Sequence, residues 1–220
     1  MAIPKIIHQT FKTNKLPLIT RLYISSFKRK NPGYRYEFYD DERIEAFFAK
    51  EFGGDVLRAY QKLNIGAAKA DMFRYAVLYK FGGVYVDIDG YISSDLDTFI
   101  QPDDHAILTL ERHHDFYAQW ALIYAPGHPF LKKTIDLIVD NIFSNKFPHD
   151  VHAMTGPTVY TKAVNECLKE DPSIPYRVFG RDYGKYLQVK YKLGKFFLYK
   201  KKSDHWKKLQ LRVPVVKPEN

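Results

Sequence analysis

Short apolar runs alternate along this chain with longer segments in which apolar residues recur every three or four positions. The short runs predict strands over residues 3–9, 34–39, 84–86, 106–110 and 117–124. The periodic segments predict helices over residues 19–30, 41–52, 54–63, 67–79, 129–143 and 157–169. Because strands and helices alternate, we expect a single α/β domain over 1–220, with a sheet packed between helices.

The predicted helix 67–79 and the strand after it place charged residues in a regular arrangement. The helix carries an apolar stripe made of Met72, Tyr75, Ala76 and Tyr79. Asp71 and Arg74 lie three positions apart, so they project together from a neighbouring face of the helix. The wholly apolar strand 84–86 then leads directly into Asp87-Ile88-Asp89-Gly90.

Asp87 and Asp89 are candidate metal ligands. Side chains alternate along a strand, so both carboxylates are expected on one side, at the carboxyl end where open α/β sheets bind ligands. Neighbouring carboxylates repel each other unless a cation lies between them. Mn²⁺ or Mg²⁺ fits, because such ions combine one or two carboxylates with phosphate oxygens. The alternative is a solvated Asp-x-Asp-Gly turn, since short matches of this kind are common.

Composition narrows the class of protein only in part. Apolar residues make up 45% of the 220 residues, which predicts a packed core rather than a disordered chain. The net charge of +9 indicates an anionic partner: nucleic acid, a phosphorylated small molecule or anionic lipid. No secretory signal and no apolar run long enough to span a bilayer are found, so a cytoplasmic location is expected.

The run from Lys69 to Asp89, KADMFRYAVLYKFGGVYVDID, resembles the signature of the DXD-type glycosyltransferases of family 32. That family includes fungal initiating mannosyltransferases, bacterial capsule and lipopolysaccharide enzymes and, more distantly, glucosylating bacterial toxins. Similar landmarks follow the family's order, with IPKIIHQT at 3–10, PGHP at 126–129 and TGP at 155–157. The resemblance covers most of the chain up to about residue 165.

The resemblance implies a single GT-A domain, a Rossmann-like fold that binds nucleotide sugars. It also implies a metal-dependent, retaining hexosyltransferase that uses a UDP- or GDP-hexose together with Mn²⁺ or Mg²⁺. The acceptor is then a hydroxyl of a glycan or of a lipid-linked sugar, as in polysaccharide, capsule or lipopolysaccharide biosynthesis.

Individual residues receive roles from the same resemblance. Asp89 is expected to bind the cation directly, and Asp87 to contact the ribose and the hydrated metal. Asp71 and Arg74 are expected to hold hydroxyls of the donor sugar and, with Asp89, form the predicted catalytic set. A surface ion pair is the alternative for Asp71 and Arg74. The sequence His8-Gln9-Thr10-Phe11 is expected to flank the nucleotide base.

Some positions depart from the family pattern. Phe11 stands where many relatives carry Trp, and Gln119, a candidate donor contact, lies near a position often held by Asn. The C-terminal Ser203-Asp204-His205-Trp206 loosely resembles a His-rich family segment that ends in Ser-Trp. Trp206 is therefore a candidate donor-side aromatic and His205 a candidate third metal ligand, with a surface histidine beside a tryptophan as the alternative.

No carboxylate stands out as a nucleophile for double displacement. We therefore expect front-face attack by the acceptor hydroxyl, with the leaving phosphate taking its proton. The cation and basic residues would offset the charge on the departing nucleoside diphosphate.

The segment 185–220 is expected to close the active site. Between 185 and 208 it contains nine lysines and a single acid, Asp204, interleaved with aromatic residues. Three interpretations remain open for it. It could attach the protein to the inner face of an anionic membrane; it could neutralise phosphate at the active site; or it could form a solvated face.

Two other functions fit parts of this pattern. Phosphatases of the haloacid dehalogenase type also place Asp-x-Asp-Gly after an apolar strand, with the first Asp as nucleophile. Here, however, the motif follows 86 residues, Tyr91 stands where Thr or Val is usual, and Asp71 and Arg74 have no role in that chemistry. A basic nucleic-acid-binding module lacks the expected zinc spacing or RNP-like strand, so no nucleic acid partner is predicted.

Overall fold

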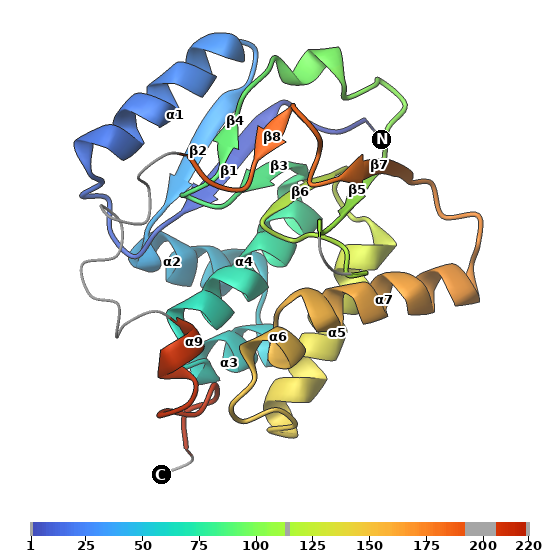
Figure 1. The fold of residues 1–220 in the computed structure, drawn as a ribbon. Coiled ribbons are helices and arrows are strands. Elements are labelled where there is room, and N and C mark those ends of the chain that lie inside the picture. Colours follow the sequence, from blue (N-terminus) through green and yellow to red (C-terminus); the bar gives the residue numbers. More distant parts are fainter. Residues whose placement is uncertain (1, 113–114, 192–205, 219–220) are drawn as a thin grey trace.

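The computed structural model of this chain describes residues 2–112, 115–191 and 206–218. Its central sheet is built from β1 (Ile6–Thr10), β2 (Arg35–Tyr39), β3 (Gly83–Val86), β5 (Ala106–Leu110), β6 (Ala121–Tyr124) and β7 (Arg177–Arg181). The strand order is β2-β1-β3-β6-β5-β7 (Figure 1). β6 is antiparallel to β3 and β5, whereas the other neighbouring strands are parallel. The expected mixed α/β sheet is confirmed.

Helices cover both faces of this sheet (Figure 1). One face carries α2 (Asp41–Glu51), α3 (Gly54–Lys62), α4 (Gly66–Phe81), α5 (Pro129–Phe143), α6 (Val151–Met154) and α7 (Pro157–Glu170). The other carries α1 (Leu18–Lys30), the 3₁₀ turn η1 (Leu96–Thr98) and a two-stranded sheet of β4 (Tyr91–Ile92) and β8 (Leu187–Gln188). A short helix, α9 (Trp206–Leu209), follows near the C-terminus.

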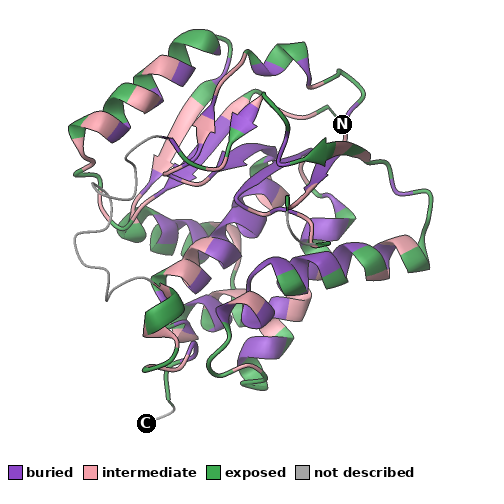
Figure 2. Cartoon of the chain, viewed as in Figure 1, coloured by how far each residue is buried: buried purple, intermediate pink, exposed green. Residues whose placement is uncertain are grey.

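Alternation along β3 decides which face carries the site. Val84 and Val86 pack in the core beneath α1, whereas Tyr85 packs in the larger core around α4. The next position on the side of Tyr85 is Asp87, because strand side chains alternate with a period of two. Asp87 is thereby directed toward α4. β3, β6 and positions 71–78 of α4 are buried throughout (Figure 2).

The helix predicted over 67–79 is longer than expected, and the prediction that it is amphipathic was wrong. α4 spans Gly66–Phe81 and is buried on every side over positions 71–78. It lies between the sheet and helices α5 and α6, so it has no solvent face along this stretch. A helix buried on every side need not have one apolar and one polar face, and here the buried positions include the paired charges of Asp71 and Arg74.

One other expectation differs from the structure. The strand predicted over 117–124 begins only at Ala121. Within the part of the chain that the structure describes, no helix is both long enough and apolar enough to cross a membrane.

Gly83→Ala is expected to lower the free energy of unfolding by about 2–4 kcal/mol. Gly83 has a φ of +103°, and a Cβ there would lie 2.5 Å from the carbonyl oxygen of Ile6 in the neighbouring strand. Urea unfolding measures the effect. Gly66→Ala is the matched control, because a Cβ at the start of α4 meets nothing within 4 Å. Equal decreases in the free energy of unfolding of the two variants would contradict the proposed clash at Gly83.

Candidate functional site

A tight turn follows β3 at the edge of the sheet where the parallel strand β1 also ends. The backbone N–H of Gly90 donates to the carbonyl oxygen of Asp87 over 2.8 Å. Only glycine fits here, because a Cβ at Gly90 would lie 2.7 Å from Cγ1 of Val86. Asp87 and Asp89 thus belong to a turn rather than to a strand, so the strand alternation on which their predicted common side rested does not extend to both of them.

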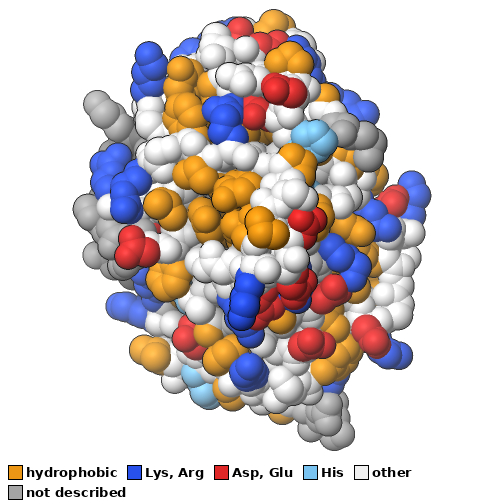
Figure 3. All heavy atoms as spheres, turned by 90° about the vertical axis from the view of Figure 1, so that its right-hand side faces the viewer, with side chains coloured by type: hydrophobic (Ala, Val, Ile, Leu, Met, Phe, Trp, Pro, Cys, Tyr) orange, Lys and Arg blue, Asp and Glu red, His pale blue; other side chains and the backbone are white. Residues whose placement is uncertain are grey.

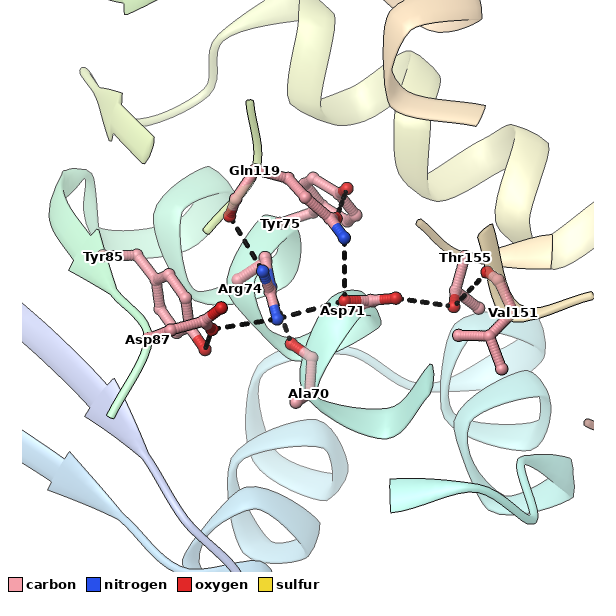
Figure 4. A network of polar contacts seen from close by, with 9 residues as sticks. All are labelled: Ala70, Asp71, Arg74, Tyr75, Tyr85, Asp87, Gln119, Val151 and Thr155. Carbon is pink, nitrogen blue, oxygen red and sulfur yellow. Dashed lines mark hydrogen bonds and ion pairs between the residues drawn. The ribbon is translucent and has the colours of Figure 1, made fainter. Parts of the chain in front are cut away.

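Arg74 lies between the two predicted carboxylate groups of the site (Figure 4). Its Nη2 is 3.0 Å from Oδ1 of Asp71 and 3.1 Å from Oδ1 of Asp87. Nη1 donates to the backbone oxygen of Gln119 over 2.8 Å. Only 5% of Arg74 is exposed, so this is a buried, hydrogen-bonded charge rather than the surface ion pair that was the alternative.

Asp71 accepts hydrogen bonds on both carboxylate oxygens. Oδ1 accepts from Nε2 of Gln119 over 3.2 Å, and Oδ2 accepts from the hydroxyl of Thr155 over 3.0 Å. Burial raises the pKa of Asp71 to about 7, although the charge of Arg74 acts in the opposite direction. Asp71 is therefore a buried carboxylate held in a fixed orientation by Arg74, Gln119 and Thr155.

Tyr85 contacts both Asp87 and Arg74. Its hydroxyl donates to Oδ1 of Asp87 over 3.0 Å, and the centroid of its ring lies 4.9 Å from Cζ of Arg74. Burial raises the pKa of Asp87, while Arg74, the Tyr85 hydrogen bond and the charge of Lys190 oppose the rise. Arg74, Lys190 and the carboxylates together form a site with paired charges of both signs.

The segment predicted to flank the base lies mostly inside the protein. The side chains of His8 and Gln9 are fully buried, and that of Thr10 nearly so. His8 Nε2 is 3.0 Å from the backbone oxygen of Gly82, and Gln9 donates to the backbone oxygen of Asp87 over 3.1 Å. In this conformation these side chains position the turn, and Phe11 is the more exposed member of the four.

The stability of the protein is expected to fall by up to about 3 kcal/mol between pH 6.5 and pH 4 because of His8. Burial lowers the pKa of His8 from 6.5 to about 4. As the pH falls, the unfolded chain therefore gains this proton before the folded protein does, which favours unfolding. Urea unfolding of His8→Gln should show a smaller decrease in the free energy of unfolding across this pH range than the wild type. His149→Gln, a substitution at an exposed histidine, serves as the control. If the free energy of unfolding depended on pH identically in the wild type and both variants, His8 would not be the cause.

The C-terminal segment reaches the turn at Tyr191. The backbone N–H of Tyr191 donates to the carbonyl oxygen of Asp89 over 3.0 Å. Trp206 packs its ring against His152 in α6, with the ring centroids 5.4 Å apart. His205, predicted as a third metal ligand, lies outside the described residues, as does most of the lysine-rich run.

The carboxylates of the turn fit a hard divalent cation. Asp87 and Asp89 would supply oxygen ligands two residues apart, and both side chains remain partly exposed. No cluster of three or more His, Cys, Asp or Glu suited to a metal occurs among the described residues. Mn²⁺ and Mg²⁺ do not need such a cluster, because one or two carboxylates with phosphate and water oxygens complete their coordination.

Sequence reasoning missed three residues of this site: Tyr75, Tyr85 and Thr155. Tyr75 donates its hydroxyl to the side-chain oxygen of Gln119. Tyr85 could have been found, because it precedes Asp87 by two positions on the same side of a strand. Thr155 was noted only as part of the TGP landmark at 155–157, and its contact with Asp71 joins positions 84 residues apart.

A family model described as a glycosyltransferase sugar-binding region containing a DXD motif matches residues 19–106. Inositol phosphoceramide mannosyltransferase 3 of Schizosaccharomyces pombe is 31% identical over 160 residues, which are 71% of this chain and 43% of that protein. An uncharacterized glycosyltransferase, L373 of Acanthamoeba polyphaga mimivirus, is 30% identical over 179 residues, covering 78% of this chain and 68% of that protein. The chain thus spans less than half of the yeast relative.

Among solved structures, the PaToxG glycosyltransferase superposes on this chain with a TM-score of 0.65. The sequence identity is 21%, and the superposition covers 77% of this chain and 70% of the other. At this identity the likeness concerns the fold alone, and it confirms the expected GT-A architecture.

Proposed function

This chain belongs to the family of glycosyltransferases whose sugar-binding region contains a DXD motif, and we propose that it transfers a hexose from a nucleoside-diphosphate sugar to a hydroxyl group. The observation that carries the proposal is the buried network in which Arg74 joins Asp71 of α4 to Asp87 of the turn. It supports the proposal because one guanidinium group joins Asp71, the proposed sugar ligand, to Asp87, which is proposed to lie beside the diphosphate.

In this proposal Asp71 and Arg74 bind the donor sugar. Asp71 accepts hydroxyl protons, and Arg74 donates to sugar or phosphate oxygens through its planar fork. Gln119 holds Asp71 through its amide, and Tyr75 holds Gln119 in turn. Such a chain of hydrogen bonds fixes the orientation of Asp71, which is needed to distinguish hexoses that differ in one hydroxyl.

Asp89 and Asp87 would hold Mn²⁺ or Mg²⁺ together with diphosphate oxygens, with His205 as the predicted third ligand. When bound, the cation would offset the charge of the departing nucleoside diphosphate. Phe11 and Trp206 remain the predicted aromatic neighbours of the base and the donor.

The transfer is proposed to retain the anomeric configuration. The acceptor oxygen bonds to the anomeric carbon on the face from which the phosphate oxygen departs, and the acceptor proton passes to that phosphate. Asp87 is not assigned as a nucleophile in this proposal, and its Oδ1 is held by Arg74 and by the hydroxyl of Tyr85. The phosphatase alternative would require that carboxylate to attack phosphorus, and it gives the buried pair of Asp71 and Arg74 no role.

The names of relatives favour mannose and a glycolipid acceptor. The S. pombe relative is named for mannosyl transfer to inositol phosphoceramide, and another relative for α-1,6-mannosyl transfer. We therefore propose a mannosyl donor and a hydroxyl on a glycan or phosphorylated lipid, rather than a capsule or lipopolysaccharide acceptor.

The test is turnover of GDP- and UDP-hexoses with Mn²⁺, followed by NMR of the product anomeric proton. Release of nucleoside diphosphate with a retained anomeric configuration supports the proposal. An inverted product would refute front-face attack. Hydrolysis of an aryl phosphate that is lost in Asp87→Asn would instead support the phosphatase.

A further inference from the structure

Positive charge gathers in two segments of this protein. Residues 1–36 contain eight Lys and Arg and no Asp or Glu. Residues 185–208 contain nine Lys and one Asp, and most of them lie outside the described residues. The first of these segments lies almost wholly within the part of the chain that the structure describes, and it contains no acid.

Within this segment, α1 presents an exposed stripe of mixed apolar and basic character. Six of its exposed positions follow helical spacing, namely Leu18, Arg21, Leu22, Ser25, Lys28 and Arg29. Lys30 is exposed as well, but its Nζ donates to the Tyr91 hydroxyl and to the backbone oxygen of Ser93. Leu18 is 64% exposed and Leu22 is 56% exposed, although both are large apolar residues. The opposite side of the helix buries Thr20, Ile24 and Phe27 against the sheet (Figure 2).

The inner side of α1 is connected to the candidate site. Tyr23 stacks on Tyr191 with ring centroids 4.3 Å apart, and the hydroxyls of Thr20 and Tyr191 are 2.7 Å apart. Tyr191 in turn donates its backbone N–H to the carbonyl oxygen of Asp89. One side of α1 thus supports the Asp87–Asp89 turn, while its other side is exposed.

We propose that the exposed stripe of α1 binds an anionic lipid surface. Arg21, Lys28 and Arg29 complement lipid phosphates, and the two leucines enter the boundary between headgroups and acyl chains. Nucleic acid would match the cations alone, since it offers no apolar layer for exposed leucines. Because a helix is only about 10–12 Å across, this orientation holds the turn close to the lipid surface.

Another exposed apolar region differs in its charge. The face that carries β7 and α7 also displays apolar side chains, among them Tyr176 and Val178, but charges of both signs surround them (Figure 3). Charge complementarity to an anionic surface is therefore a property of α1 and not of every exposed apolar patch.

The test is sedimentation of the full chain with vesicles of phosphatidylcholine, with and without phosphatidylserine. The triple variant Arg21→Gln/Lys28→Gln/Arg29→Gln is expected to bind anionic vesicles at least tenfold more weakly, because each basic residue contributes about fivefold. The pair Leu18→Ser/Leu22→Ser is expected to weaken binding about tenfold. Both variants should unfold at the wild-type temperature, since these side chains are exposed.

The matched control is Lys132→Gln/Lys162→Gln/Lys169→Gln, which removes the same charge from exposed positions of α5 and α7. It should bind vesicles within twofold of the wild type. If both triple variants lost vesicle binding equally, net charge alone would explain the binding and the proposal would be overturned. Unchanged vesicle binding by the leucine pair, or binding of single-stranded oligonucleotides only, would also overturn it. No donor is present in this assay, so its outcome is independent of the proposed transfer reaction.

Discussion

Arg74→Met is expected to lower transfer activity by about 10³-fold and the free energy of unfolding by about 3–5 kcal/mol. Arg74 is the shared partner of Asp71 and Asp87, and its removal leaves two buried or half-buried carboxylates without their cation. The same change removes the donors proposed to bind the sugar and phosphate oxygens. Urea unfolding and initial rates of nucleoside diphosphate release measure the two effects.

Two controls separate these contributions. Arg58→Met removes an arginine that lies three positions after Asp55, the same spacing as between Asp71 and Arg74. Because the pair of Asp55 and Arg58 is exposed, the free energy of unfolding should decrease by less than about 0.5 kcal/mol. Arg74→Lys keeps the charge and loses the planar fork, so it should recover part of the stability and little of the activity. An Arg74→Met protein as active as the wild type would contradict the proposed role of the network.

Asp89→Asn is expected to lower metal-dependent transfer by about 10³-fold and to change stability by less than about 1 kcal/mol. The substitution keeps the size of the side chain and removes the charge proposed to bind the cation. The turn itself should persist, because its contact with Tyr191 uses the backbone oxygen of Asp89.

Activity assays over a Mn²⁺ titration, with circular dichroism to confirm folding, measure this effect. Asp115→Asn is the control, since Asp115 is an almost fully exposed acid paired only loosely with Arg181. If Asp89→Asn retained wild-type activity at every Mn²⁺ concentration, Asp89 would not be a metal ligand.

Local signals in the sequence were sufficient to predict many of the helices and strands. The helix predicted over 129–143 matches α5, because Pro129 occupies the first helical position and His128 caps it. Asp40 likewise caps α2 by accepting from the backbone N–H of Arg43. By contrast, the burial of α4 on all sides depends on which elements surround it, and periodicity within 67–79 does not contain that information.

The site was predictable where its residues are neighbours in sequence. The i,i+3 spacing of Asp71 and Arg74 correctly predicted that they contact each other. The contacts of Arg74 with Asp87 and of Asp71 with Thr155 join distant segments, so they depend on the fold. The turn at Asp87–Gly90 was taken for the end of a strand because an apolar run shows where a strand lies but not where its hydrogen bonds stop.

Asp87-Ile88-Asp89 is proposed to bind a cation and a nucleotide sugar together. Thermal unfolding of the wild type and of Asp89→Asn with a panel of GDP- and UDP-hexoses, with and without Mn²⁺, tests this proposal. A donor is expected to raise the unfolding temperature of the wild type only when Mn²⁺ is present and not to raise that of Asp89→Asn, since stabilisation follows ligand saturation. Equal stabilisation by a donor without metal, or in Asp89→Asn, would show that the cation and Asp89 are not needed for donor binding.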